Sequence, residues 1–71
     1  MVNEPTRNRL RVLRADRRIA QEVVAFKAGI KPSRYWKIEN GLKVPTRDEA
    51  RALAAILKVR QRDLGFEAIA S

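Results

Sequence analysis

The sequence contains no cysteine and no histidine, and these two absences exclude several classes of site at once. Without cysteine the chain cannot form a disulfide or a thiolate zinc site, and without histidine it has no imidazole to bind a metal or to activate a nucleophile. The carboxylates are spread along the chain, so the sequence assembles no acid–base pair. We therefore expect no enzymatic activity, no metal, no cofactor and no small-molecule ligand.

Long apolar runs are also missing. None approaches the ~20 residues that a membrane-spanning helix requires, and residues 1–5 lack the basic-then-apolar order of a signal peptide. We expect a cytoplasmic, nucleoid-associated protein that does not contact a membrane. A chain of 71 residues has room for one domain. We predict that it spans residues 1–71, with a core from 6 to 66 and no separate effector domain.

Positive charge is what the sequence has in excess. Sixteen lysines and arginines stand against eight acids, which gives a formal net charge of +8. Such an excess suggests a polyanionic partner, and the alternative is a charged surface that only keeps the protein soluble. The distribution favours a partner, because six basic residues between Lys27 and Arg47 accompany a single acid, Glu39, for a net charge of +5.

Apolar residues recur at helical spacing and never alternate over the length of a strand, which predicts an all-α fold. Glycine and proline mark boundaries: Gly29 is suited to end one helix, and Pro32 is suited to the first position of the next. Thr6 is a candidate cap for the first helix, and Thr46 followed by Glu49 matches a capping box. The five expected helices span about residues 6–17, 21–27, 32–39, 46–57 and 61–65.

The second and third expected helices are short and are joined by a turn that contains glycine, which is the helix-turn-helix pattern. Further residues carry a family resemblance: Arg9 to Arg14, Gln21 to Ala25, Gly29-Ile30, Tyr35, Ile38 to Gly41, Pro45-Thr46 and Leu53-Ala54. With them the chain resembles the Xre/Cro phage-repressor family of DNA-binding domains, without gaps, over about residues 9–66. The resemblance implies a five-helix lambda-repressor-like domain that binds double-stranded DNA, with helix 32–39 in the major groove.

The resemblance also implies roles for individual side chains. Those expected to face bases are Ser33, Arg34, Lys37 and Pro32, the last by apolar contact with a thymine methyl group. Those expected at phosphates are Gln21, Lys31, Asn40, Lys43 and Trp36, with the backbone amides around Gly41. Alternatives stay open: an ordinary exposed side chain for Gln21, a phosphate contact for Arg34 or Lys37, a helix cap for Asn40, and packing on a helix or a partner subunit for Trp36.

Glu39 is the one acid of the basic stretch, and DNA would repel it. The resemblance implies that it instead forms a structural salt bridge with Arg14 of the first helix, while Tyr35 and Ile38 face the core. Arg14 would then hold helices together and would not contact DNA.

The chain departs from the family at positions that usually cap or end helices. Ala20 and Lys31 stand where a side-chain cap is usual, and each missing cap costs ~1 kcal/mol. Arg18 and Lys58 replace glycines, at a cost of up to ~1 kcal/mol each if they adopt left-handed geometry.

The expected function is that of a sequence-specific transcriptional regulator, a repressor that occupies a promoter. It would bind a palindromic operator as a homodimer, with half-sites about 34 Å apart. Candidate dimer contacts are Ile56, Leu64, Phe66 and Ile69. Dimerisation through the first helix, or no stable dimer, are the alternatives. An antitoxin that neutralises a partner enzyme is the alternative function, and RNA binding is a third, for which Trp36 is the only stacking candidate.

Overall fold

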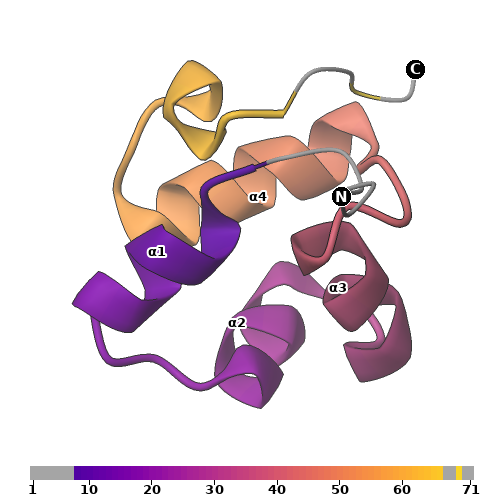
Figure 1. Cartoon of the computed structure of the whole chain (residues 1–71), viewed down its shortest axis with the longest axis horizontal. Helices are drawn as coiled ribbons and strands as arrows, with labels where there is room; N and C mark the ends of the chain where they lie inside the picture. Colours follow the sequence, from indigo (N-terminus) through magenta and orange to yellow (C-terminus); the bar gives the residue numbers. More distant parts are fainter. Residues whose placement is uncertain (1–7, 67–68, 70–71) are drawn as a thin grey trace, which may run out of the picture.

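The computed structural model describes residues 8–66 and residue 69, and its elements are helical (Figure 1). They are α1 (Leu10–Asp16), α2 (Gln21–Ala28), α3 (Pro32–Glu39) and α4 (Arg47–Leu57), followed by the 3-10 helix η1 (Gln61–Leu64). Helix α2 packs against both α3 and α4, and η1 packs against α4. The expected all-α class is confirmed, and α2 and α3 form the helix-turn-helix pair.

The boundaries of α2, α3 and α4 follow from local signals in the sequence. Gly29 adopts left-handed geometry with φ 71° directly after α2, and Pro32 occupies the first position of α3. At the start of α4 the Thr46 hydroxyl accepts from the Glu49 amide at 3.1 Å, and the Glu49 carboxylate accepts from the Thr46 amide at 2.8 Å. The expected capping box is therefore present.

Two expectations about helices need correction. Helix α1 begins at Leu10, with Arg9 as its N-cap, and Thr6 lies outside the described residues. The short fifth helix is a 3-10 helix of four residues, so the described part of the domain has four α-helices and a 3-10 turn where five helices were expected. Gly65 adopts left-handed geometry with φ 75° and ends the segment before the i→i−4 bonds of an α-helix can follow.

The departures at helix ends have the geometry that the positions require, even where the residue type is unfavourable. Neither Ala20 nor Lys31 provides a side-chain cap, so α2 and α3 both begin without one. Arg18 and Lys58 adopt left-handed geometry, with φ values of 53° and 58°. Each of these conformations costs up to about 1 kcal/mol relative to glycine.

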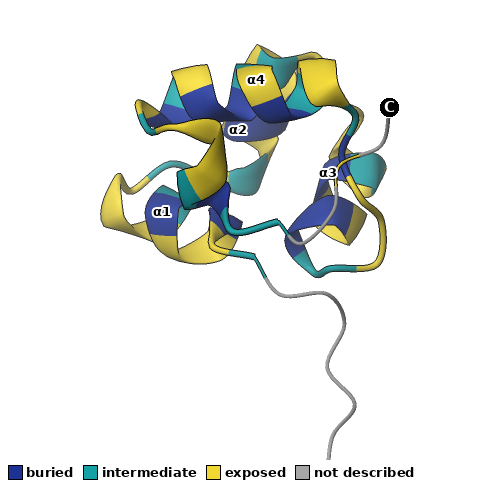
Figure 2. Cartoon of the chain, turned by 90° about the horizontal axis from the view of Figure 1, so that it is seen from above, coloured by how far each residue is buried: buried dark blue, intermediate teal, exposed yellow. Residues whose placement is uncertain are grey.

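The core forms between α1, α2, α4 and the inner face of α3, and the residues buried in it are coloured dark blue on these helices in Figure 2. Its members are Leu10, Leu13, Val24, Ala25, Ile30, Tyr35, Ile38, Ala50, Leu53, Ala54, Leu57 and Leu64. The amide of Arg9 donates to the carbonyl of Leu64 at 2.8 Å, which joins the start of α1 to η1. This packing fixes one face of α3 and leaves the opposite face exposed.

Candidate nucleic-acid interface

The exposed face of α3 is polar and basic. Ser33, Lys37 and Asn40 recur at i, i+4 and i+7 and therefore lie in one stripe, away from the buried residues Tyr35 and Ile38. Ser33 and Lys37 are exposed, as are Lys31 and Pro32 at the start of the helix and Lys43 in the loop after it. These side chains are accessible to a ligand that approaches α3 from solvent.

Trp36 lies beside this stripe, and its residue is 48% exposed. It is absent from the buried core and from the partly buried residues packed against the core. An amphipathic ring at the surface usually has a polar partner for its N–H.

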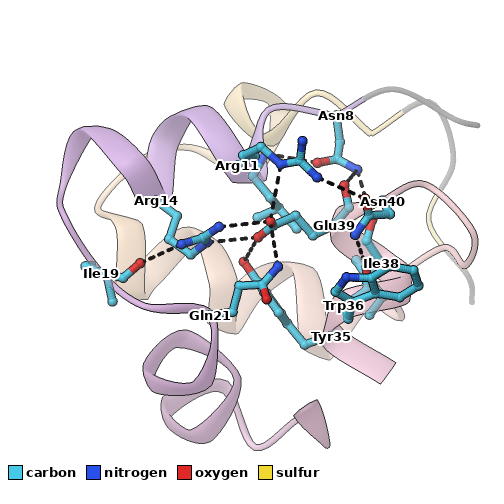
Figure 3. A network of polar contacts seen from close by, with 11 residues as sticks. Asn8, Arg11, Arg14, Ile19, Gln21, Tyr35, Trp36, Ile38, Glu39 and Asn40 are labelled. Atoms are coloured by element: carbon cyan, nitrogen blue, oxygen red, sulfur yellow. Dashed lines mark hydrogen bonds and ion pairs between the residues drawn. The ribbon is translucent and has the colours of Figure 1, made fainter. Parts of the chain in front are cut away.

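A buried carboxylate network fixes the end of α3 (Figure 3). The side chain of Glu39 is 0% exposed, and Arg14 donates to it from Nε at 2.9 Å and from Nη2 at 3.0 Å. Tyr35 donates its hydroxyl at 2.8 Å and Gln21 its amide nitrogen at 2.9 Å. Arg14 also donates to the carbonyl of Ile19 at 2.9 Å. The structure thus joins α1, α2 and α3 through the pair that the resemblance implied.

The electrostatics of the network keep its carboxylate charged. Burial alone would raise the pKa of Glu39, but the hydrogen bonds from Arg14, Gln21 and Tyr35 outweigh burial and hold that pKa below its ordinary value. Burial, helped by the hydrogen bond to Glu39, raises the pKa of the Tyr35 hydroxyl. All buried polar side-chain atoms in the described part of the chain have a hydrogen-bond partner. The network is therefore fully satisfied, which makes it a rigid support for α3.

Gln21 has a different partner from the phosphate expected for it. Its residue is half-buried, and its amide nitrogen donates to Glu39, so it anchors the start of α2 to the end of α3. One of its two N–H groups is used in this way, and the other is not needed for the contact.

Asn40 also makes contacts within the protein. Its side-chain nitrogen donates to the carbonyl of Trp36 at 2.8 Å, and its side-chain oxygen accepts from Nη2 of Arg11 at 2.9 Å. The first bond is the helix-capping role that the sequence left open. The second brings in Arg11, whose side chain is 66% exposed and whose Nε lies 3.6 Å from Glu39.

The backbone amides after α3 are not available to DNA. The amide of Gly41 donates to the carbonyl of Ile38 at 3.1 Å, and the amides of Leu42 and Lys43 donate to the carbonyl of Lys37 at 2.7 and 3.3 Å. The expectation that these amides bind phosphate is therefore wrong. The last carbonyls of a helix lack partners within the helix, and here the chain turns back to supply them.

Arg34 forms an ion pair that the sequence did not suggest. Its Nε and Nη2 each donate to one oxygen of Glu49 at 2.7 Å, which ties the first turn of α3 to the first turn of α4. The Arg34 side chain is 33% exposed and that of Glu49 is 18% exposed. The hydrogen bond from Arg34 lowers the pKa of Glu49, and the same bond raises the pKa of Arg34. The structure therefore shows Arg34, which was expected to face bases or a phosphate, engaged with Glu49 along one edge of its guanidinium.

Asn8 is a further residue that the sequence reasoning missed. Its side-chain nitrogen donates to the carbonyls of Ile38 and Glu39 at 2.9 and 3.2 Å, and its oxygen accepts from the amide of Leu10 at 2.9 Å. One asparagine thus starts α1 and satisfies the end of α3. An asparagine two residues before a helix is the only local signal for this role.

Comparison with known proteins identifies the family to which this arrangement of helices belongs. A family model described as a helix-turn-helix domain matches residues 7–65. The chain belongs to this family. Among solved structures, the restriction-modification controller protein C.AhdI from Aeromonas hydrophila is 32% identical, with a TM-score of 0.74 over 79% of this chain and 85% of that chain. No curated protein matches.

The resemblance to Xre/Cro regulators is thereby confirmed, and the fold of this helix-turn-helix domain is lambda-repressor-like. The chain is a DNA-binding transcriptional regulator of the helix-turn-helix class, in a family whose members are typically not enzymes. Within residues 8–66 and 69, no helix has the length and apolar character to cross a membrane. The same residues contain no cluster of three or more side chains of metal-binding type.

The candidate dimer contacts of the helix-turn-helix domain are distributed differently from expectation. Leu64 is 0% exposed and belongs to the core, so the expectation that it contacts a partner subunit is wrong. Phe66 packs against the core and Ile56 is half-buried, while Ile69 is 38% exposed. Among the described residues, the most exposed large apolar residue is Phe26 on α2, at 85%, which the sequence reasoning did not single out.

Proposed function

We propose that this helix-turn-helix domain is a sequence-specific transcriptional repressor that binds a palindromic operator as a homodimer. In this proposal α3 lies in the major groove and reads bases directly. The observation that carries it is the polar stripe of Ser33 and Lys37 on a helix whose far end is fixed by the buried carboxylate of Glu39. Base readout requires side chains on a rigid element, because a small displacement breaks the geometry of a specific contact.

Lys37 is proposed as the principal base-reading residue. It is exposed in the middle of the stripe, and a lysine ammonium donates well to O6 and N7 of guanine. Ser33 lies one turn earlier on the same face and donates or accepts with its hydroxyl. Pro32 is exposed at the first position of α3 and has no N–H, so we assign it apolar contact with a thymine methyl group.

The phosphate contacts are proposed to flank this stripe. Lys31 and Lys43 are exposed before and after α3 and bring positive charge to both ends of the helix. Further phosphate contacts are assigned to the indole N–H of Trp36 and to the second N–H of the Asn40 amide, whose first N–H donates to Trp36. Gln21 retains one amide hydrogen at the start of α2, where Ala20 leaves the first turn without a side-chain cap, and such a helix end attracts anions.

Dimerisation is proposed through Ile56 of α4, Phe66 and Ile69, each of which retains exposed area. A two-fold dimer presents two copies of α3 to two half-sites, about 34 Å apart, on one face of the duplex. Repression follows from occupancy, because a bound dimer excludes polymerase from an overlapping promoter.

The experiment is a selection of bound sequences from a random DNA pool, performed at two salt concentrations. We expect a palindromic consensus of two half-sites that persists at the higher salt concentration. Recovery of no consensus, with affinity that collapses in salt, would leave only nonspecific attraction to phosphates. A stoichiometric enzyme that co-purifies from the native host would instead favour an antitoxin.

A narrower candidate rests on the similarity to C.AhdI. That protein is described as a restriction-modification controller, and the identity of 32% extends over 79% of the present chain. If this chain has the same role, its selected operator will lie upstream of genes for a restriction endonuclease or a methyltransferase. Location of the consensus in the host genome tests this directly.

A further inference from the structure

The guanidinium of Arg34 has two edges that can each donate a pair of hydrogen bonds. Glu49 occupies the first edge, which consists of Nε–H and one hydrogen of Nη2, at 2.7 Å to each carboxylate oxygen. The second edge consists of Nη1 and the remaining hydrogen of Nη2. Within residues 8–66 and 69, Nη1 has no partner, and besides its bond to Glu49 Nη2 makes only a long contact of 3.5 Å to the carbonyl of Val44.

The carboxylate that holds Arg34 is itself held. One oxygen of Glu49 accepts from the amide of Thr46 at 2.8 Å, and the amide of Glu49 donates to the Thr46 hydroxyl at 3.1 Å. Within the capping box, the Thr46 amide therefore orients the Glu49 carboxylate, and the carboxylate in turn orients the guanidinium of Arg34. A long side chain that would otherwise sample many rotamers is confined to one.

Arg34 also lies next to the stripe proposed to read bases. It follows Ser33 directly and precedes Lys37 by one turn, so it lies at the α4 side of that stripe. Its side chain is 33% exposed although its first edge is engaged, so the second edge can reach solvent.

We propose that Glu49 is a positioning residue for base recognition, which holds Arg34 so that its second edge donates to O6 and N7 of one guanine in each half-site. Glu49 does not touch DNA in this scheme. Glu49 instead fixes the direction in which Nη1 and Nη2 of Arg34 donate. Bidentate recognition of guanine requires two donors in such a fixed geometry. The inference rests on the proposed function, because it assumes that α3 reads DNA.

The test compares the wild-type domain with Glu49→Gln, Arg34→Lys and Arg34→Ala. Glutamine keeps the side-chain length and one oxygen for the Thr46 amide, but it has no second oxygen for the guanidinium. Lysine keeps the charge of Arg34 and has no planar fork. Each protein is used in the random-pool selection, and its affinity is measured for the wild-type consensus and for duplexes with each guanine replaced.

Two control variants separate positioning from charge and from stability. Asp48→Asn removes a carboxylate from the same turn, where the Asp48 side chain is 93% exposed and does not contact Arg34. Thr46→Ala removes the hydroxyl that caps α4 but keeps the backbone amide that donates to the Glu49 carboxylate and orients it. Thermal melting of all variants ensures that binding is measured where each is folded.

We expect the wild-type domain to prefer one guanine per half-site by about tenfold or more. Arg34→Ala and Arg34→Lys should lose that preference, and Glu49→Gln should lose most of it, while preferences at other positions persist. Asp48→Asn and Thr46→Ala should retain it. For Glu49→Gln, affinity for the duplex without this guanine should change less than threefold.

The possible failures are distinguishable. If Arg34→Ala loses the guanine preference while Glu49→Gln keeps it, Arg34 reads the base without positioning, and the inference is overturned while the proposed function stands. If no Arg34 variant alters any preference, the ion pair is only structural, and the inference is again overturned alone. If the wild-type domain yields no consensus, the proposed function falls together with the inference.

Discussion

Replacement of Glu39 by alanine removes the acceptor on which α1, α2 and α3 converge. The Glu39 side chain is 0% exposed and that of Arg14 is 17% exposed, so the guanidinium left behind is largely shielded from water. Removal of one partner from a buried ion pair costs about 3–5 kcal/mol. Arg14 keeps the carbonyl of Ile19 and some contact with solvent. We therefore expect the lower end of this range, about 3 kcal/mol.

A loss of this size is readily measured in a small domain. At about 4–8 °C per kcal/mol, the Tm of Glu39→Ala should fall by roughly 12–24 °C. Circular dichroism during thermal and urea unfolding gives both the Tm and the free energy. Glu22→Ala is the matched control, because Glu22 is exposed on α2 and its loss should change stability by no more than about 0.5 kcal/mol.

A second variant tests the reason for the loss. The double variant Arg14→Met/Glu39→Met replaces the ion pair with apolar side chains of similar length. It should recover part of the lost stability, because no unpaired charge remains in the interior. A loss below about 1 kcal/mol for Glu39→Ala, or a double variant less stable than the single one, would refute this reasoning.

Further predictions follow from other parts of the fold. Ala20→Ser supplies the missing cap of α2 and should raise the free energy of unfolding by about 1 kcal/mol in urea titrations. Lys58→Gly relieves a left-handed conformation and should raise it by up to about 1 kcal/mol, whereas the same change at an interior position of α4 should lower it. Leu64→Ala should cost about 2–5 kcal/mol without a specific effect on self-association, measured by sedimentation of the folded protein, because Leu64 is a core residue. The pKa of Glu39 is lower in the folded chain than in the unfolded chain, so its contribution is fully present above the ordinary pKa of about 4.5 and is lost as the pH falls through the lower folded-state value. Glu39→Gln should therefore lose less stability than wild type between neutral and acidic pH, and equal losses would contradict the assigned shift.

The parts of the fold that could be predicted are those with local signals. Gly29, Pro32 and the Thr46–Glu49 pair act within a few residues of themselves, so the sequence alone places α2, α3 and α4 closely. The short final segment lacked such a signal. Gln61–Leu64 has too few residues to establish a helical period, so the sequence could not distinguish a 3-10 helix from an α-helix there.

The side-chain partners in the site were less predictable, because they join residues far apart in the chain. The contact between Gln21 and Glu39 spans 18 positions, and that between Arg34 and Glu49 spans 15. Residue type shows that these side chains can donate or accept hydrogen bonds, but only the packed fold shows which partners they have. The same holds for Leu64, which is buried where its hydrophobicity could equally have served an interface.

Helix α3 is proposed to distinguish one DNA sequence from others. The most direct measurement compares equilibrium affinity for the selected operator with affinity for a scrambled duplex of equal length and composition, across a range of salt concentrations. We expect the domain to bind the operator at least about 10³-fold more tightly than the scrambled duplex. This preference should persist as rising salt weakens both complexes. Equal affinities for the two duplexes at every salt concentration would contradict it.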